Sequence, residues 1–311
     1  MAKKREVILK RFLDESGAQT RERQRLLGEI ASEISKAWPN ATKGSPLVIS
    51  YFVDYRYGML HPQDAVMLED VLQARGSDHN LYLIVDGPGG FGLAAEQVVN
   101  VCRTYGSGGF TAIVPKTAKS ACSVICMGAD RIVMGPAAEL GPIDPQVRQP
   151  DGKSFSADSY VERYKKTLRD AENTKGNIEP FLMGLKSFDP VLVEEMEREI
   201  ALSRKIAEDV LFTGMWKGKK RTRQLSETLA VFTSPSKKGS HGRAILFPEL
   251  KEIGLEVEQI PPDTDLWGCI WELYNRTQAM FLTGCSNLIE TADVSFTCPR
   301  GRSTRGDENK T

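Results

Sequence analysis

Two separate stretches of the chain combine residue types that suit nucleophilic chemistry. The first is LIVDGPGG (residues 83–90), where an apolar, strand-like run leads directly into a glycine-rich turn. Pro88 fixes its own φ angle, and Gly89 and Gly90 allow backbone conformations that are closed to other residues. A turn between a strand and a helix can direct free N–H groups at an oxyanion or a phosphate. The stretch lacks the lysine of a nucleotide P-loop, and a plain tight turn is the alternative interpretation.

The second stretch is KSACSVICMGADRIVMG (residues 119–135), in which a serine precedes a run of small residues. Ser120 is either the N-cap of a helix or a nucleophile. If it is a nucleophile, the N–H of Ala121 helps to bind the developing oxyanion. Cys122 and Cys126 lie four residues apart on the predicted helix. Structural zinc requires four ligands, so we interpret these two thiols as packing residues and expect no metal.

The surrounding elements alternate between short apolar runs and helical patterns. The predicted strands are residues 45–53, 80–87, 109–118 and 130–135, and the predicted helices are residues 21–38, 64–75, 93–106 and 120–129. Asp64 is the expected N-cap of its helix, and Gly106 is the expected end of another. Continuous apolar strands joined by helices predict an α/β fold whose parallel strands are buried on both faces.

The second half of the chain is more helical. Residues 156–174 and 189–212 predict long amphipathic helices, and residues 247–260 predict a short helix, a glycine turn and a strand. The basic run at residues 217–224 indicates a solvated helix face or loop, with a nucleic-acid patch as the minority interpretation. The segment 233–242 is a polar loop. The polar tail after Thr291 is expected to be disordered at its end.

Composition narrows the class of protein. Among 311 residues there are 41 Lys and Arg against 41 Asp and Glu, so charge indicates neither a nucleic acid nor an anionic membrane as partner. No apolar run approaches the roughly 18 residues of a membrane helix. The N-terminus lacks the apolar stretch of a secretory signal, and the six cysteines include no Cys-x-x-Cys pair. We therefore expect a cytoplasmic protein with reduced thiols.

Taken together, DGPGGFGLAAEQVV and AIVPKTAKSACSVICMGADRIVMGPAAELGPIDPQV resemble the serine dehydrogenase proteinase family. That family belongs to the ClpP/crotonase superfamily and is related to the signal-peptide peptidase SppA. The resemblance is dense over residues 80–148 and continues thinly over residues 240–257. It implies a ClpP/crotonase-like spiral of ββα units, with additional helices at the N-terminus and in the second half, and a homo-oligomer.

On this resemblance the chain divides into three parts. Residues 1–44 form an N-terminal helical arm. Residues 45–262 form the ClpP/crotonase-like core, with a helical insertion at about 156–230. Residues 263–311 form a C-terminal helix and a flexible tail.

The resemblance also assigns roles to residues of the two stretches. Ser120 falls where ClpP-type and SppA-type peptidases keep the catalytic serine. Gly89 falls at the first oxyanion amide, with Gly90 beside it in the same substrate-binding turn, and the amide after the serine belongs to Ala121.

The identity of the general base stays undecided, because the chain departs from the patterns of both ClpP-like and SppA-like enzymes. ClpP-like enzymes have a histidine about 25 residues after the serine, where this chain offers Asp144 in PIDPQ. SppA-like enzymes use a lysine, and Lys165, Lys166 and Lys175 lie in the corresponding stretch. A hydroxyl without a base within hydrogen-bond reach is a poor nucleophile.

The three histidines of the chain are therefore of interest. His61 and His79 lie in predicted loops and are interpreted as surface residues. His241 falls where the serine dehydrogenase proteinase family typically has a histidine, so it is the first candidate base, oriented by Asp144. Asp144 before Pro145 also suits a turn. A serine without a base, and hence weak or lost activity, is the third possibility.

We predict a serine peptidase-like hydrolase whose serine attacks a peptide carbonyl, with a peptide or protein as substrate and no cofactor. The first alternative is a catalytically weak or inactive assembly or interaction protein. The second is a crotonase-like acyl-CoA enzyme in which the same amides polarise a thioester. No lysine motif for pyridoxal phosphate is evident, so serine dehydratase chemistry is not expected.

Overall fold

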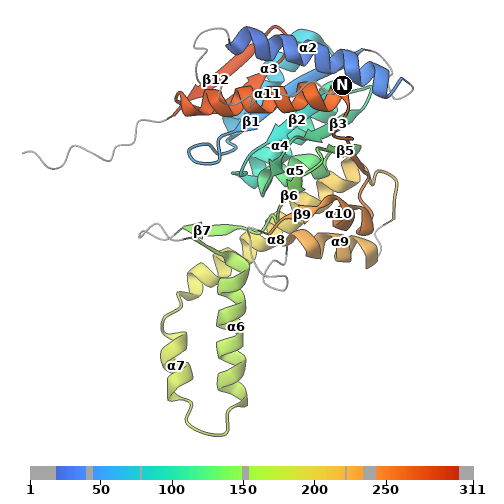
Figure 1. The fold of residues 1–311 in the computed structure, drawn as a ribbon. Coiled ribbons are helices and arrows are strands. Elements are labelled where there is room, and N and C mark those ends of the chain that lie inside the picture. Colours follow the sequence, from blue (N-terminus) through green and yellow to red (C-terminus); the bar gives the residue numbers. More distant parts are fainter. Residues whose placement is uncertain are drawn as a thin grey trace, which may run out of the picture.

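The computed structural model describes residues 19–39, 45–77, 79–148, 154–220, 223–233 and 243–300. Its centre is a seven-stranded sheet in the order β10-β5-β3-β2-β1-β11-β12 (Figure 1). These strands are β1 (Pro46–Val53), β2 (Asn80–Asp86), β3 (Phe110–Val114), β5 (Arg131–Met134), β10 (Val257–Gln259), β11 (Cys285–Glu290) and β12 (Ser295–Pro299). The strands from β10 to β1 pair in parallel, which confirms the predicted α/β fold, and β11 and β12 add an antiparallel edge.

Alternate residues of the central strands point to opposite faces, and both faces are covered. On one face Leu83 and Val85 of β2 pack in the larger hydrophobic cluster, together with helices α3 (Pro62–Arg75), α4 (Gly92–Tyr105), α5 (Ala121–Met127) and α8 (Pro190–Thr213). On the other face Tyr82 and Ile84 pack against α2 (Gln19–Ala37) and α11 (Asp265–Leu282), which lie side by side in Figure 1. Strands buried on both faces explain why these runs are almost continuously apolar.

Helix α2 is also fixed to the sheet by a buried ion pair. Arg23 donates to both carboxylate oxygens of Glu290 on β11, at 2.7 and 2.8 Å, and both side chains are fully buried. Ser295 of β12 donates to the same carboxylate at 2.7 Å. A buried charge needs such partners because its desolvation is costly.

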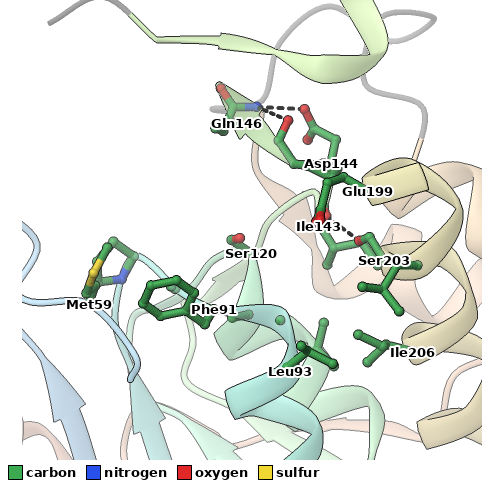
Figure 2. A pocket seen from close by; sticks show the side chains of 18 of the residues that line it. Met59, Phe91, Leu93, Ser120, Ile143, Asp144, Gln146, Glu199, Ser203 and Ile206 are labelled. Atoms are coloured by element: carbon green, nitrogen blue, oxygen red, sulfur yellow. Dashed lines mark hydrogen bonds between the residues drawn. The ribbon is translucent and has the colours of Figure 1, made fainter. Parts of the chain in front are cut away.

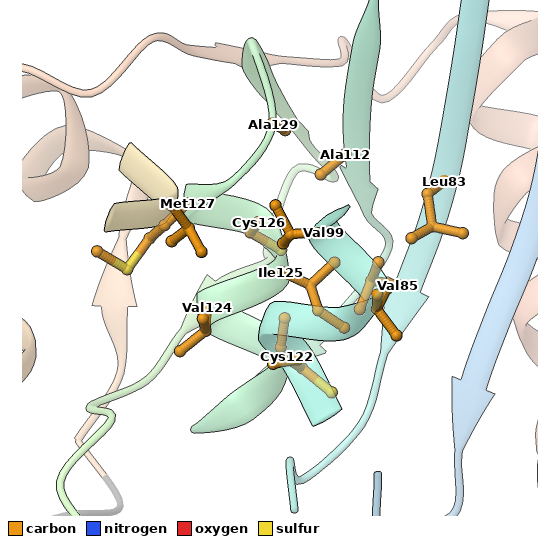
Figure 3. Packing of buried hydrophobic residues seen from close by; sticks show 14 of the residues in the cluster. Leu83, Val85, Val99, Ala112, Cys122, Val124, Ile125, Cys126, Met127 and Ala129 are labelled. Atoms are coloured by element: carbon orange, nitrogen blue, oxygen red, sulfur yellow. The ribbon is translucent and has the colours of Figure 1, made fainter. Parts of the chain in front are cut away.

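The small residues after Ser120 pack as predicted. Figure 3 shows Cys122 and Cys126 of α5 among Val99, Ile125 and Val85. Both thiols are buried in the larger hydrophobic cluster and unpaired, which confirms the packing interpretation.

Two local predictions are wrong in detail. The predicted strand 109–118 is broken into β3 and the short strand β4 (Thr117–Ala118). Pro115 has no N–H to continue the ladder of β3, and the chain turns there. The N-cap of α3 is His61 rather than Asp64; Asp64 lies at the third helical position and accepts from the His61 N–H at 2.8 Å, as in a capping box.

A helical arm carries the chain away from the sheet and back (Figure 1). It contains α6 (Ala157–Asn173), α7 (Glu179–Leu185) and the start of α8, and follows the hairpin of β7 (Gln146–Arg148) and β8 (Ser154–Ser156). These helices confirm the two predicted amphipathic segments. The described side chains of the basic run are exposed, and Lys219 and Arg223 form ion pairs with Glu256 and Glu227, as expected of a solvated face.

The remaining elements complete the core. A three-stranded sheet joins β4, β6 (Glu139–Leu140) and β9 (Ile245–Leu246). In the chain, helix α9 (Arg223–Thr233) precedes β9, and α10 (Phe247–Glu252) follows it. The short helix, turn and strand predicted at residues 247–260 are present. The polar segment after Thr291 contains β12, which was not predicted: its residues alternate weakly, and pairing with β11 stabilises it. Within the described residues no helix is long and apolar enough to cross a membrane.

Candidate active site

Ser120 occupies a strained position between β4 and α5. It is the one non-glycine residue of the described chain with positive φ, at φ 49° and ψ −124°. It stands at the N-cap position of α5, yet its side chain makes no capping hydrogen bond. The N-cap interpretation therefore does not explain this serine. Strained backbone of this kind persists where the surroundings impose it, commonly at functional sites.

The surroundings that impose this conformation are hydrogen bonds on both sides of the serine. The Ser120 N–H donates to the carbonyl of Pro142 at 3.2 Å. The buried hydroxyl of Ser123 donates to the carbonyls of Ala118 and Gly141, at 2.7 and 2.8 Å. Helix α5 is thus tied to the strand that precedes the serine and to the segment that passes beside it.

The glycine turn lies directly against the serine. A Cβ atom placed on Gly89, whose φ is 103°, would come within 2.6 Å of the Ser120 Cβ and 2.9 Å of the Ala121 nitrogen. Only glycine allows this approach at this backbone conformation. The two stretches singled out in the sequence therefore meet in space.

The amides around the serine differ in the acceptors that they have. The Gly89 N–H faces the sulfur of Cys122, where it opposes the burial that raises the pKa of that thiol to about 12. In the described part of the chain the N–H groups of Gly90 and Ala121 make no hydrogen bond. Gly90 is exposed, and both residues line the cavity in front of Ser120. Two unused donors are available beside the hydroxyl.

A loop that sequence reasoning did not connect with the site holds the turn in place. The Leu60 N–H donates to the Gly89 carbonyl at 2.8 Å, and the Phe91 N–H donates to the Leu60 carbonyl at 3.0 Å. This loop is anchored in turn by the Asn287 side chain, which donates to the Met59 carbonyl at 2.9 Å. No local pattern in residues 54–61 signals this role, because the partners lie far apart in the sequence.

The cavity in front of Ser120 has a volume of about 640 Å³ (Figure 2). One wall is α8, which contributes Glu199, Leu202, Ser203 and Ile206. Their spacing of three, four and seven residues places them in one stripe on the helix. That spacing was readable in the sequence, but nothing in it indicated that the stripe faces a serine on another element.

The opposite wall and floor are apolar. In Figure 2 Phe91 and Met59 lie across from the α8 side chains, with Ser120 between the two walls. Phe91, Met59 and Leu93 are each about half exposed, although they are large apolar residues. Among the described residues that line the cavity there is no lysine or arginine. The charged side chains among the described lining residues are those of Asp144 and Glu199, and both are acidic.

The structure places Asp144 in this cavity. Its side chain is buried and accepts a hydrogen bond from the Gln146 amide at 2.8 Å. The preceding residue, Ile143, is fixed on both sides: its N–H donates to the Phe232 carbonyl at 2.9 Å, and its carbonyl accepts from the Ser203 hydroxyl at 2.7 Å. Asp144 thus lines the same cavity as Ser120, on a segment fixed by these hydrogen bonds.

The lysines of the predicted dyad lie elsewhere. Lys165 is on α6 and pairs with Glu197 at 2.6 Å, and Lys166 and Lys175 are exposed on the same arm. Lys119, next to the serine, pairs with Glu139 at 2.7 Å. None of these four lysines lines the cavity.

His61 is exposed at the start of α3, and His79 is partly buried and contacts the Arg75 carbonyl at 2.8 Å. Neither of these two histidines lines the cavity. His241 lies outside the described residues. The described chain resumes two residues later at Arg243, whose carbonyl accepts from the Lys119 side chain at 3.3 Å. Within the described residues no group of His, Cys, Asp and Glu side chains suits a metal ion.

Comparison with known proteins places this geometry in a family. The model of the ClpP-like SDH-type serine proteinases matches residues 55–281, more than half of the chain. The chain belongs to this family. The match includes the glycine turn, Ser120, Asp144 and the α8 wall, and ends before β11 and β12.

Two relatives are uncharacterized proteins of Methanocaldococcus jannaschii. MJ1495 is 24% identical over 207 residues, which cover 66% of this chain and 61% of that protein. MJ0137 is 25% identical over 207 residues, which cover 67% of this chain and 63% of that protein. The chain therefore spans less than two thirds of the length of these relatives.

Solved structures of ClpP1 from Listeria monocytogenes are more distant. One has 12% sequence identity and a TM-score of 0.37, with 68% of this chain and 92% of that chain covered. A mutant of the same protein has the same identity and TM-score, with 75% of this chain and 99% of that chain covered.

Proposed function

We propose that this member of the ClpP-like serine proteinase family is an active serine peptidase with Ser120 as nucleophile. The observation that carries the proposal is the strained, uncapped serine that is packed against Gly89 and lines a cavity of about 640 Å³. A serine that served only as a helix cap would use its hydroxyl for the cap and would not need positive φ.

In the proposed reaction the Ser120 Oγ attacks the carbonyl carbon of a peptide bond, and its proton passes to a base. The N–H groups of Ala121 and Gly90 stabilise the oxyanion, with Gly90 in place of the Gly89 amide that the resemblance assigned. Both residues line the cavity, and among the described residues neither N–H group has a hydrogen-bond acceptor. Gly89 supplies the close approach of the turn. The base then gives its proton to the departing amine, and water hydrolyses the acyl-enzyme by the same route.

His241 is the proposed base, with Asp144 orienting it. Support comes from two described neighbours: Asp144 lines the cavity, and the carbonyl of Arg243 lies against the side chain of Lys119. A lysine dyad has less support, because the three lysines lie exposed on the helical arm. We further propose a homo-oligomer in the cytoplasm that acts on peptide or protein substrates without a cofactor.

The test is covalent labelling by a fluorophosphonate probe, located by intact mass and peptide mapping. We expect one label at Ser120 in the natural protein and none in Ser120→Ala. Ser203→Ala is the matched control, because Ser203 lines the same cavity but donates to a backbone carbonyl. His241→Ala should slow labelling strongly, whereas Lys165→Ala should not.

Absence of labelling in a folded, natural sample would refute the peptidase and favour an assembly or interaction protein. Binding of coenzyme A that survives Ser120→Ala would instead favour a crotonase-like enzyme. Equal labelling of Ser120 in His241→Ala would remove that histidine from the mechanism while keeping the nucleophile.

A further inference from the structure

A buried carboxylate lies behind the serine and takes no part in the proposed reaction. Asp86 is the last residue of β2, and its side chain is 1% exposed. Its Oδ2 accepts a hydrogen bond from the Thr117 N–H at 2.8 Å, and the Lys116 amide and charge favour its ionised form. The carboxylate therefore joins the end of β2 to the segment that leads into Ser120.

This link is the third of three between the same two segments. The Gly87 N–H donates to the Thr117 carbonyl at 2.8 Å, and the Lys119 N–H donates to the Gly87 carbonyl at 3.0 Å. Gly87 begins the glycine turn, and Lys119 immediately precedes the serine. These three links together hold the glycine turn, which carries an oxyanion amide, at a fixed distance from the segment that carries the nucleophile.

An ionised side chain at this position is costly for the fold. Burial raises the pKa of Asp86 to about 7, opposed by the Thr117 and Lys116 amides and by the Lys116 charge. Among the described residues of other elements, the ionisable side chains that the Asp86 charge affects are Tyr55, Tyr274 and Cys122. Burial raises the pKa of each of them, so they are neutral near pH 7. A residue without charge would suit such a place better unless the carboxylate has a function.

We propose that Asp86 is a positioning residue whose carboxylate holds the Lys116–Lys119 segment so that Ser120 stands at the right distance from the glycine turn. The inference rests on the proposed role of Ser120 as nucleophile. A neutral carboxyl group is a weaker acceptor for the two amides than a carboxylate. The reactivity of Ser120 therefore follows the ionisation of Asp86 as well as that of the general base.

The experiment measures the second-order rate constant of fluorophosphonate labelling between pH 5.5 and pH 9 together with the melting temperature. The variants are Asp86→Asn and the matched control Asp130→Asn. Asp130 also caps a strand amide, accepting from the Phe110 N–H at 2.7 Å, but it lies at the opposite end of the strands from Ser120. Circular dichroism checks that each variant is folded.

We expect Asp86→Asn to lower the rate constant at pH 8 on the order of 100-fold, as small displacements of reacting groups do. Its pH profile should lose one ionisation that the natural protein shows near pH 7. Its melting temperature at pH 8 should be equal or higher, because a buried charge is removed. A merely structural role would lower stability and reactivity together. Asp130→Asn should keep the natural rate constant.

Natural reactivity of Asp86→Asn across the pH range would overturn the inference and leave the nucleophile intact. No labelling of the natural protein would overturn the proposed peptidase and this inference with it. If Asp86→Asn does not fold, Asp86→Ser replaces it, since a hydroxyl still accepts from one amide. The same loss of rate and of the ionisation is expected there, and a natural profile would again overturn the inference.

Discussion

The protein should lose stability as the pH rises from about 4 to about 7, through the carboxyl group of Asp86. Burial raises its pKa from 3.8 in the unfolded chain to about 7 in the fold. Between these values the unfolded chain has released the proton and the folded chain still holds it, so rising pH favours unfolding. The rise in the pKa of Asp86 from 3.8 to about 7 changes the free energy of unfolding by about 4 kcal/mol, because each pH unit contributes roughly 1.36 kcal/mol. This is a large part of the 5–15 kcal/mol or so that stabilises a typical domain.

Urea unfolding of the natural protein and of Asp86→Asn at several pH values measures this contribution. Other titrating groups are shared, so they cancel in the difference between the two free energies of unfolding. The natural protein should lose about 4 kcal/mol relative to the variant between pH 4 and pH 8. A difference that stays constant within about 1 kcal/mol would show that the folded protein ionises Asp86 as readily as the unfolded chain, which would refute the burial argument.

Four further substitutions test three other features of the structure. Gly89→Ala should abolish labelling of the nucleophile and lower the free energy of unfolding by more than about 1 kcal/mol. Gly28→Ala, on an open helix surface, should instead raise the free energy of unfolding in urea by up to about 1 kcal/mol. Equal effects of the two variants would contradict the close approach of the turn. Arg23→Met should cost about 3–5 kcal/mol because it leaves the Glu290 carboxylate buried and unpaired, and a loss below about 1 kcal/mol would contradict that burial. Glu199→Lys should change the relative affinity for peptides by up to about fivefold, away from lysine and toward glutamate near the scissile bond. The assay is competition of such peptides with the labelling probe. An unchanged preference would show that Glu199 does not select substrates.

The apolar runs predicted most of the fold because burial on both faces of a parallel sheet leaves a plain mark on local sequence. The strand ending at Asp86 and the helix ending at Gly106 appear where they were expected. The antiparallel hairpin of β11 and β12 did not leave such a mark. Besides its own pairing, it is stabilised by the antiparallel pairing of β11 with β1 and by the link from Asn287 to the loop at Met59. These last two contacts join residues more than 200 positions apart.

The site shows the same division. The glycine turn and the serine were both found by residue type, because glycine and an isolated serine before small residues are unusual enough to notice. The strain at Ser120 and the direction of the Gly89 amide were not readable, since both depend on hydrogen bonds from other elements. Asp144 was chosen by its position after the serine, and the structure places it in the cavity.

The α/β class, the family and the two stretches that meet at the site could be recognised from local pattern in the residues. The folded arrangement was needed to show that α8 forms a wall of the cavity, that the three lysines lie on a separate arm, and that Asp86 is buried against the segment that leads into Ser120. These outcomes depend on which surfaces the folded chain brings together. The free energy of burying a charge or an apolar stripe belongs to that arrangement and to no single segment.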